Sequence, residues 1–336
     1  MKVIEGAVGI KATVLADSIS EAGVRLTTFE IEYPRIVHAE LMTHRVFSRN
    51  AASSRAIPFA KMKEQLTGRP VRFGKNVAGM QDAGEHREYI MGKPQEYDGN
   101  VGAPALTPEE AWDAAREDAI FWADAFASAG YHKQVTGRIT ECYQMMKTVI
   151  TATEWENWKW LRIDGSADPT IAELARVMKL AQDGSEPAPL AAGEYHLPYV
   201  DTYLYADGRP GIWYGIDVEH ADGWTDIVEV SLEDAIKVSC ARCAAVSYRN
   251  EGYGVEKSRE LFDRLVGSDK KHASALEHCA TPMQAPHYYN GVNLSGVTGT
   301  WEDGVTHMDR NGQLWSGNLR GWIQYRKLVP GENYEG

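Results

Sequence analysis

The stretch VRLTTFEI, residues 24–31, alternates apolar and polar side chains and predicts a β-strand with one buried face. Pro34 follows this strand and marks the start of a predicted helix over residues 35–47. Short runs of Tyr, Trp, Val and Ile, broken by Asp-Gly, predict strands and hairpins within residues 194–230, and residues 244–248 are a further predicted strand. Strands interleaved with long helices indicate a mixed α/β (α+β) fold.

The sequence Thr107-Pro108-Glu109-Glu110 is typical of a helix start, with an N-cap threonine, proline in the first turn and acidic residues near the positive end of the helix dipole. Apolar residues at helical spacing follow and predict a core-facing stripe that ends at Gly130. Further predicted helices cover residues 138–147, 154–161, 169–182, 234–245, 255–266 and 318–328. The last of these could instead supply Gln324 or Arg326 to a ligand.

The charge balance bears on the class of partner. The 336 residues include 47 acidic and 35 basic side chains, which disfavours nonspecific binding of a nucleic acid polymer but allows a local cationic pocket. No apolar run approaches the roughly 18 residues of a membrane span, and the N-terminus has no signal-peptide pattern. Four cysteines do not make a disulfide framework, so we expect a cytoplasmic protein without a membrane partner.

The densest polar cluster is THRVFSRNAASSR, residues 43–55, which holds three arginines, a histidine and three serines. Guanidinium groups and hydroxyls offer several directed donors to one anion and suit phosphate recognition. A solvated basic turn is the alternative interpretation.

This cluster resembles a family signature. His44-Arg45, seven residues and then Ser53 is similar to the Arg-His-Arg, seven residues, Ser motif of flavin-dependent thymidylate synthases. Arg55 also matches, whereas Thr43 stands where the family has its first arginine.

Other blocks extend the resemblance. Arg138 is similar to a nucleotide-binding arginine of the family, and residues 151–162 resemble a later helix of which Asn157 and Arg162 are preserved. Residues 240–248 (CARCAAVSY) and 272–278 (HASALEH) resemble the family's Ala-Ala-Arg-Val-Ser-Phe strand and its His-Glu-Thr-Pro-Phe-Glu-His element. In the family both elements precede the Arg-His-Arg motif, so this chain resembles a circularly permuted member.

The resemblance implies one flavin-dependent thymidylate synthase-like domain over residues 1–336, with insertions at 68–107 and 184–230. It implies FAD, NADPH and methylenetetrahydrofolate as cofactors, dUMP conversion to dTMP, and a homotetramer with sites built across subunits. Arg162 would be catalytic and face the base, where its charge favours negative charge at N3 or O4 and activates C5. Ser53, Arg55 and Arg138 would hold the nucleotide phosphate. The FAD site would comprise His44, Arg45, Asn157, Ser247, His272, Ser274 and Glu277.

Two departures concern the substrate. Glu40 stands where the family has glutamine and Ala51 where it has glutamate. A carboxylate at Glu40 could accept from an exocyclic amine, which makes dCMP an alternative substrate, or it could pair with Arg45 or another arginine. The alternative functions are therefore a hydroxymethylase or methylase of dUMP or dCMP and, in another class, a non-catalytic nucleotide- or RNA-binding protein.

Cys240-x-x-Cys243 raises a further alternative, a structural zinc site completed by Cys279 and by His278 or His272. The small apolar neighbours favour a buried segment instead, so we predict no metal.

Overall fold

A computed structural model describes residues 3–53, 55, 57–79, 82–97, 100–208, 211–219, 224–248, 252–284, 288–289, 292–293 and 301–333. The chain mixes helices and sheets and belongs to the α+β class, as predicted. Its main sheet has the strand order β1-β2-β3-β9-β4, and β10 pairs in parallel with β2. These strands are β1 Val3–Glu5, β2 Lys11–Ser20, β3 Arg25–Pro34, β4 Ser48–Ala51, β9 Met145–Ala152 and β10 Ala188–Leu190.

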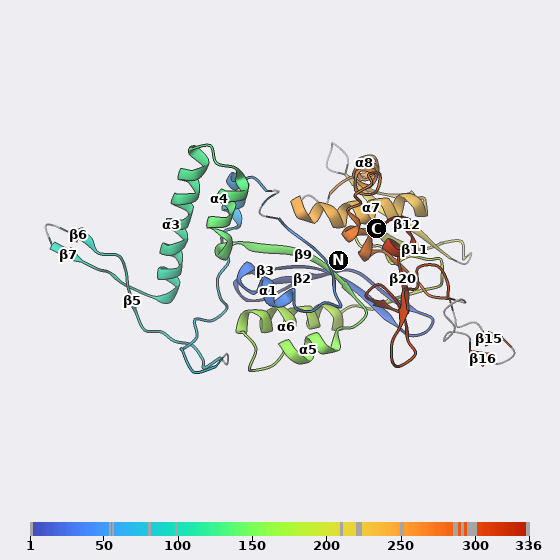
Figure 1. Cartoon of the computed structure of the whole chain (residues 1–336), viewed down its shortest axis with the longest axis horizontal. Helices are drawn as coiled ribbons and strands as arrows, with labels where there is room; N and C mark the ends of the chain where they lie inside the picture. The colour runs from blue at the N-terminus through green and yellow to red at the C-terminus, as the bar shows by residue number, and fades with distance from the viewer. Residues whose placement is uncertain are drawn as a thin grey trace.

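The main sheet is covered on both faces (Figure 1). Alternation in β3 points Phe29, Ile31 and Tyr33 toward α5 (Glu156–Arg162) and α6 (Pro169–Asp183), with which they share one hydrophobic cluster. A second cluster on the other face joins β9 to α7 (Leu232–Ala245) and to the 3-10 helix η6 (Ala273–His278). Helix α8 (Val255–Val266) packs on α7.

A helical unit stands at one end of the sheet (Figure 1). It contains α2 (Phe59–Met62), α3 (Pro108–Ser128) and α4 (Lys133–Ile139). The predicted start of α3 is confirmed, because Thr107 and Glu110 form a reciprocal capping box. The predicted core-facing stripe is wrong within this chain, since Ala123 alone of the helix is buried.

The segment 68–107 forms an arm that reaches outward beyond α3 (Figure 1). It carries the short pairs β5 (Ile90–Met91) with β8 (Ala105–Leu106) and β6 (Gln95–Tyr97) with β7 (Asn100–Gly102). Lys93 forms an ion pair with Asp118 and joins the arm to α3. None of the helices in the described ranges is long and apolar enough to span a membrane.

The strands predicted within residues 194–230 are confirmed as an antiparallel sheet of β11 (Asp201–Leu204), β12 (Ile212–Glu219) and β13 (Thr225–Val230). Small pairings complete the C-terminal part of the described chain, where β14 lies beside β20 and β17, β18 and β19 are consecutive neighbours. These strands are β14 Ala280–Pro282, β15 Tyr288–Tyr289, β16 Val292–Asn293, β17 His307–Met308, β18 Leu314–Ser316, β19 Leu319–Arg320 and β20 Trp322–Gln324. Helix α1 covers His38–Leu41, near the start of the chain.

Four predicted elements are wrong. Residues 35–47 hold only a 3-10 turn (Arg35–Val37) and the four-residue α1, and residues 244–248 end α7 and form a 3-10 turn. Residues 318–328 form β19, β20 and the 3-10 turn Tyr325–Leu328. The helix predicted over 138–147 ends at Ile139, because residues 145–152 pair with β3 and β4 and are almost fully buried between them. Burial by distant strands overrides local helical spacing there.

Candidate functional site

Arg162, at the end of α5, contacts Glu40 on α1 and two residues of the 43–55 cluster, Thr43 and His44. Its Nε donates to His44 Nε2 at 3.0 Å, and its Nη1 donates to Glu40 Oε2 at 3.1 Å. Its Nη2 lies 3.3 Å from the hydroxyl of Thr43. The fold therefore brings together residues that are more than a hundred positions apart in the sequence.

The environment of this group fixes its charges. His44 is buried between Phe47, at a ring distance of 5.7 Å, and the edge of Trp158, at 4.8 Å. Burial lowers the pKa of His44 to about 4, and the charges of Arg162 and Arg49 act in the same direction. The imidazole is thus neutral near pH 7, and its Nε2 accepts a hydrogen bond from Arg162 Nε–H. Burial raises the pKa of Glu40, as does the nearby Asp168, and Arg162 opposes both effects.

Arg45, Arg55 and Arg138 are exposed. No carboxylate of the described residues pairs with any of them, so their guanidinium groups are available to an anion. Arg49, in contrast, donates to the backbone oxygens of Met42 and His44, and the charge of Glu277 acts on it.

The predicted phosphate-binding residues belong to the helical unit. Ala52 and Ile57, which flank Ser53 and Arg55, share a hydrophobic cluster with Ile139, the neighbour of Arg138. The backbone N–H of Ser53 also donates to Ser247 O at 3.2 Å. The described contacts join this group to Ser247 but not directly to Arg162, so the chain holds the predicted phosphate and base residues in separate groups.

Glu277, on η6, forms an ion pair with Arg326. Its Oε1 accepts from Arg326 Nη1 at 2.5 Å, and Arg326 Nε also donates to Glu332 Oε2 at 2.6 Å. Arg326, which the sequence offered as a ligand contact, therefore pairs within the chain. The predicted FAD residues Asn157, His272 and Ser274 are exposed, and Ser247 is half-buried.

A polar cluster beside η6 contains Gln324, which the sequence offered as a ligand contact, and Asn318, which the sequence did not single out. Asn318 Nδ2 donates to Val46 O at 2.9 Å and to Ser48 Oγ at 3.0 Å, and Gln324 Nε2 donates to Asn318 Oδ1 at 2.8 Å. Gln324 therefore pairs within the chain, and nothing in the local pattern distinguishes Asn318, which stands in a segment with helical spacing. Their contacts brace the loop that follows His44.

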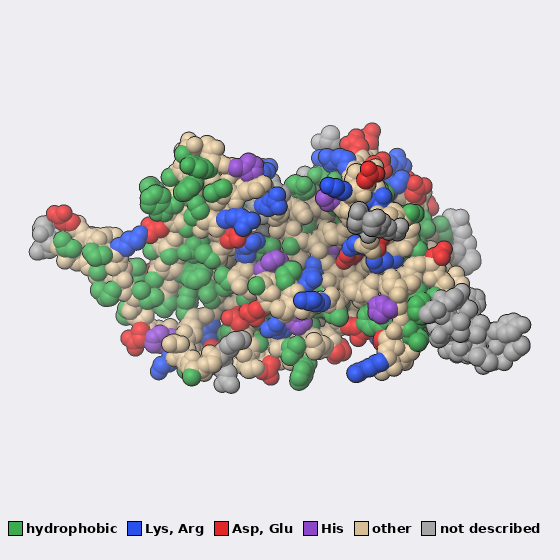
Figure 2. Space-filling model, viewed as in Figure 1, with side chains coloured by type: hydrophobic (Ala, Val, Ile, Leu, Met, Phe, Trp, Pro, Cys, Tyr) green, Lys and Arg blue, Asp and Glu red, His purple; other side chains and the backbone are tan. Residues whose placement is uncertain are grey.

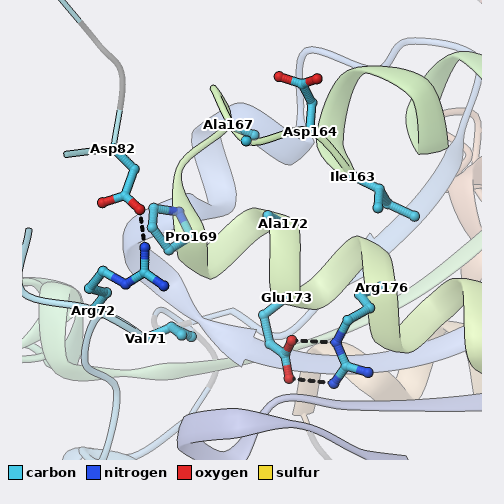
Figure 3. A pocket seen from close by; sticks show the side chains of 11 residues that line it. Val71, Arg72, Asp82, Ile163, Asp164, Ala167, Pro169, Ala172, Glu173 and Arg176 are labelled. Atoms are coloured by element: carbon cyan, nitrogen blue, oxygen red, sulfur yellow. Dashed lines mark hydrogen bonds and ion pairs between the residues drawn. The ribbon is translucent and has the colours of Figure 1, made fainter. Parts of the chain in front are cut away.

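A separate cavity of about 410 Å³ lies between the α5–α6 connection and the base of the arm (Figure 3). Ion pairs between Arg72 and Asp82 and between Glu173 and Arg176 line it. Ile163, the neighbour of Arg162, reaches it, but the predicted site residues do not. Because these charges pair with each other, the cavity is a weaker candidate for an anionic ligand than the exposed arginines.

The cysteines do not form a metal site in the described part of the chain. Cys240, Cys243 and Cys279 are fully buried, and Cys240 Sγ lies 3.5 Å from Cys279 Sγ. Burial raises the pKa of both Cys240 and Cys243. Among the described residues, no three His, Cys, Asp or Glu side chains are arranged to hold a metal ion, so their geometry gives the zinc alternative no support.

No known protein-family model and no curated protein matches this chain.

Proposed function

We propose that this protein is a flavin-dependent thymidylate synthase-like enzyme that transfers one carbon to C5 of a deoxypyrimidine nucleotide, converting dUMP to dTMP with methylenetetrahydrofolate and NADPH. The observation that carries the proposal is the contact of Arg162 with Glu40, Thr43 and His44. The 43–55 cluster and the 151–162 block each resemble the family, and they meet at Arg162, the arginine that the resemblance places beside the base.

The available donors fit a dinucleotide cofactor. FAD carries two phosphates, and Arg45, which follows His44 in the sequence, offers an exposed, unpaired guanidinium. His272, Ser274, Ser247 and Asn157 would supply further polar contacts, while Glu277 would act from its ion pair with Arg326. When bound, the flavin would supply the redox chemistry that the side chains lack. Arg55 and Arg138 would bind the nucleotide phosphate.

Arg162 and Glu40 would read the pyrimidine edge. Side by side, the guanidinium donates and the carboxylate accepts. Uracil offers O4 as an acceptor and N3–H as a donor, whereas cytosine offers N3 as an acceptor and its amino group as a donor. The pair can therefore match either base, in opposite order, and this favours dCMP as the second candidate substrate.

The proposal includes a cytoplasmic homotetramer. Several large apolar side chains on α3 and the arm are exposed to solvent. Figure 2 shows hydrophobic side chains gathered over this end of the molecule. Phe121 is 64 % exposed, Trp122 57 %, Tyr89 67 % and Met91 65 %. An interface between copies would cover them and could bring Arg55 and Arg138 of one copy to Arg162 of another. Light scattering of the purified protein tests the assembly.

The test of the activity begins with the absorption of the purified protein, where retained oxidised flavin gives a band at about 450 nm. Anaerobic incubation with NADPH, methylenetetrahydrofolate and either dUMP or dCMP, followed by mass spectrometry, then identifies the product. A gain of about 14 mass units indicates methylation and about 30 indicates hydroxymethylation.

Arg162→Lys should abolish most turnover, because lysine cannot make the three-way contact. Arg176→Lys is the matched control, since Arg176 lies on the surface of α6 and pairs with Glu173. A protein without flavin and without turnover of either nucleotide would contradict the proposal and favour a non-catalytic nucleotide- or RNA-binding protein.

A further inference from the structure

A chain of buried hydrogen bonds crosses the main sheet. It runs through Ser18 on β2, Thr28 on β3, Thr151 on β9 and Asn50 on β4, which is the order of these strands in the sheet. His196 bridges the first two strands, with Nδ1 at 2.9 Å from Ser18 Oγ and Nε2 at 2.7 Å from Thr28 Oγ1.

The second half of this chain is equally continuous. Thr28 Oγ1 and Thr151 Oγ1 lie 2.6 Å apart at directly paired positions of β3 and β9. His278 then bridges Thr151 Oγ1, 2.8 Å from its Nδ1, to Asn50 Oδ1, 3.4 Å from its Nε2. The backbones of the two histidine segments also pair, because His196 and Ala280 form an antiparallel bridge.

The chain is sealed from solvent in its middle. Thr28, Thr151 and His278 have no exposed surface and His196 has 1 %, whereas the ends, Ser18 and Asn50, have 5 % and 8 %. Burial lowers the pKa of both imidazoles to about 3, so each is neutral and carries one proton.

Because Asn50 presents its Oδ1 to His278 and both imidazoles are neutral, one direction satisfies every link. Asn50 Oδ1 can only accept, so His278 donates from Nε2–H and must accept at Nδ1 from the Thr151 hydroxyl. Thr151 then accepts from Thr28, and Thr28 accepts from His196 Nε2–H. Ser18 completes the series by donating to His196 Nδ1. A reversed link would leave a buried donor or acceptor unpaired.

We propose that these six residues act as one hydrogen-bond chain, in which the tautomers of His196 and His278 are locked together and His278 positions β4 against η6. The second part rests on the proposed function, because β4 connects His44-Arg45 to Ser53-x-Arg55 and η6 carries Ser274 and Glu277. His278 contacts β4 through Asn50 and immediately follows Glu277, so it ties the two segments together at one point. It is a positioning residue and touches no reacting atom.

The tautomers test the first part directly. In full-length protein labelled with ¹⁵N-histidine, long-range ¹H–¹⁵N spectra should show the proton on Nε2 in both His196 and His278. Thr28→Val removes the acceptor of His196, so we expect His196 to move its proton to Nδ1 and donate to Ser18, while His278 is unchanged. Thr28→Ser should restore the original tautomer.

The proposal can still be tested if Thr28→Val does not fold, because the unaltered protein and Ser18→Ala also give decisive spectra. Different tautomers at the two histidines of the unaltered protein would overturn the proposal, as would a folded Thr28→Val protein with an unchanged His196. Ser18→Ala removes only a donor to Nδ1, so it should leave both protons on Nε2. A tautomer change at either histidine in that variant would also overturn it.

FAD binding tests the positioning role. Thr151→Val cuts the chain beside His278 and should weaken FAD binding about three- to tenfold, whereas Thr151→Ser should bind FAD as the unaltered protein does. Thr202→Val is the control, because Thr202 is exposed on β11. Unchanged binding by Thr151→Val would overturn the positioning role. If the unaltered protein binds no flavin, the proposed function fails, while the tautomer spectra still decide whether the chain exists.

Discussion

At the scale of single residues, Arg162 is oriented before any ligand arrives. Each nitrogen of its guanidinium group contacts a different side chain, namely His44, Glu40 and Thr43. The planar group has little freedom to turn, which favours a defined direction for whatever it contacts next. Glu40 also offsets part of its positive charge, so this one carboxylate influences both the geometry and the charge of the site.

Replacement of this carboxylate should change nucleotide preference. Glu40→Gln keeps the size of the side chain, removes its charge and adds an amide donor. We expect the ratio of kcat/KM for dUMP over dCMP to rise about tenfold, because a neutral amide no longer opposes the negative charge that develops at N3 and O4 of uracil, whereas the cytosine amino group loses a charged acceptor. Steady-state kinetics with both nucleotides measures this ratio. Glu156→Gln, on the exposed first turn of α5, is the control, and an unchanged ratio in Glu40→Gln would remove Glu40 from substrate selection.

At the scale of elements, helix α5 shows how seven residues serve both the core and the site. Trp158 is 1 % exposed and packs against His44 and Phe47, whereas Trp160 is 76 % exposed. The buried indole nitrogen of Trp158 has no hydrogen-bond partner among the described residues. The helix is thus anchored by one aromatic side chain, and this anchor also holds the imidazole that accepts from Arg162.

Truncation of the two tryptophans of α5 should lower the free energy of unfolding by very different amounts. Trp158→Ala should lower the free energy of unfolding by about 3–5 kcal/mol, because it leaves a large cavity in the core. Trp160→Ala should change it by less than about 0.5 kcal/mol. Trp158→Phe should cost less than Trp158→Ala, since it keeps most of the ring and removes the unpaired N–H. Urea unfolding of the three variants measures these differences, and equal effects of the two alanine variants would contradict the packing of α5.

At the scale of the whole molecule, the sheet holds neutral histidines on both of its sides. Burial lowers the pKa of His196 and His278 to about 3, and burial followed by nearby arginines lowers that of His38 and His44 to about 4. The unfolded chain binds protons at these residues below about pH 6.5, while the folded chain does not. Folding is therefore opposed as the pH falls through this range.

The free energy of unfolding should accordingly decrease as pH is lowered from about 6.5 toward 4. Each such histidine adds at most about 1.4 kcal/mol per pH unit to the slope. His278→Gln should reduce the slope, and Thr202→Val, which changes no titratable group at an exposed position of β11, should not. Unfolding curves at several pH values provide the measurement. A slope that is the same in the unaltered protein and His278→Gln would show that His278 is charged in the folded state.

The sequence by itself determined the α+β class, the helices α3, α6, α7 and α8, and the strands of residues 194–230. Each of these carries its own signal in consecutive residues, such as the Thr107 capping box and the Asp168 N-cap of α6. The basic cluster of residues 43–55 was visible for the same reason. These features depend on contacts within a few positions, which a single sequence displays.

Only the tertiary structure decided which distant residues meet. Residues 145–152 become a central strand because β3 and β4 enclose them, and Arg162 finds Glu40 only when α5 packs beside α1. The pairing of Glu277 with Arg326, and the neutrality of His278, likewise follow from burial by other segments. Burial and pairing depend on neighbours far along the chain, and no local pattern records which neighbours those will be.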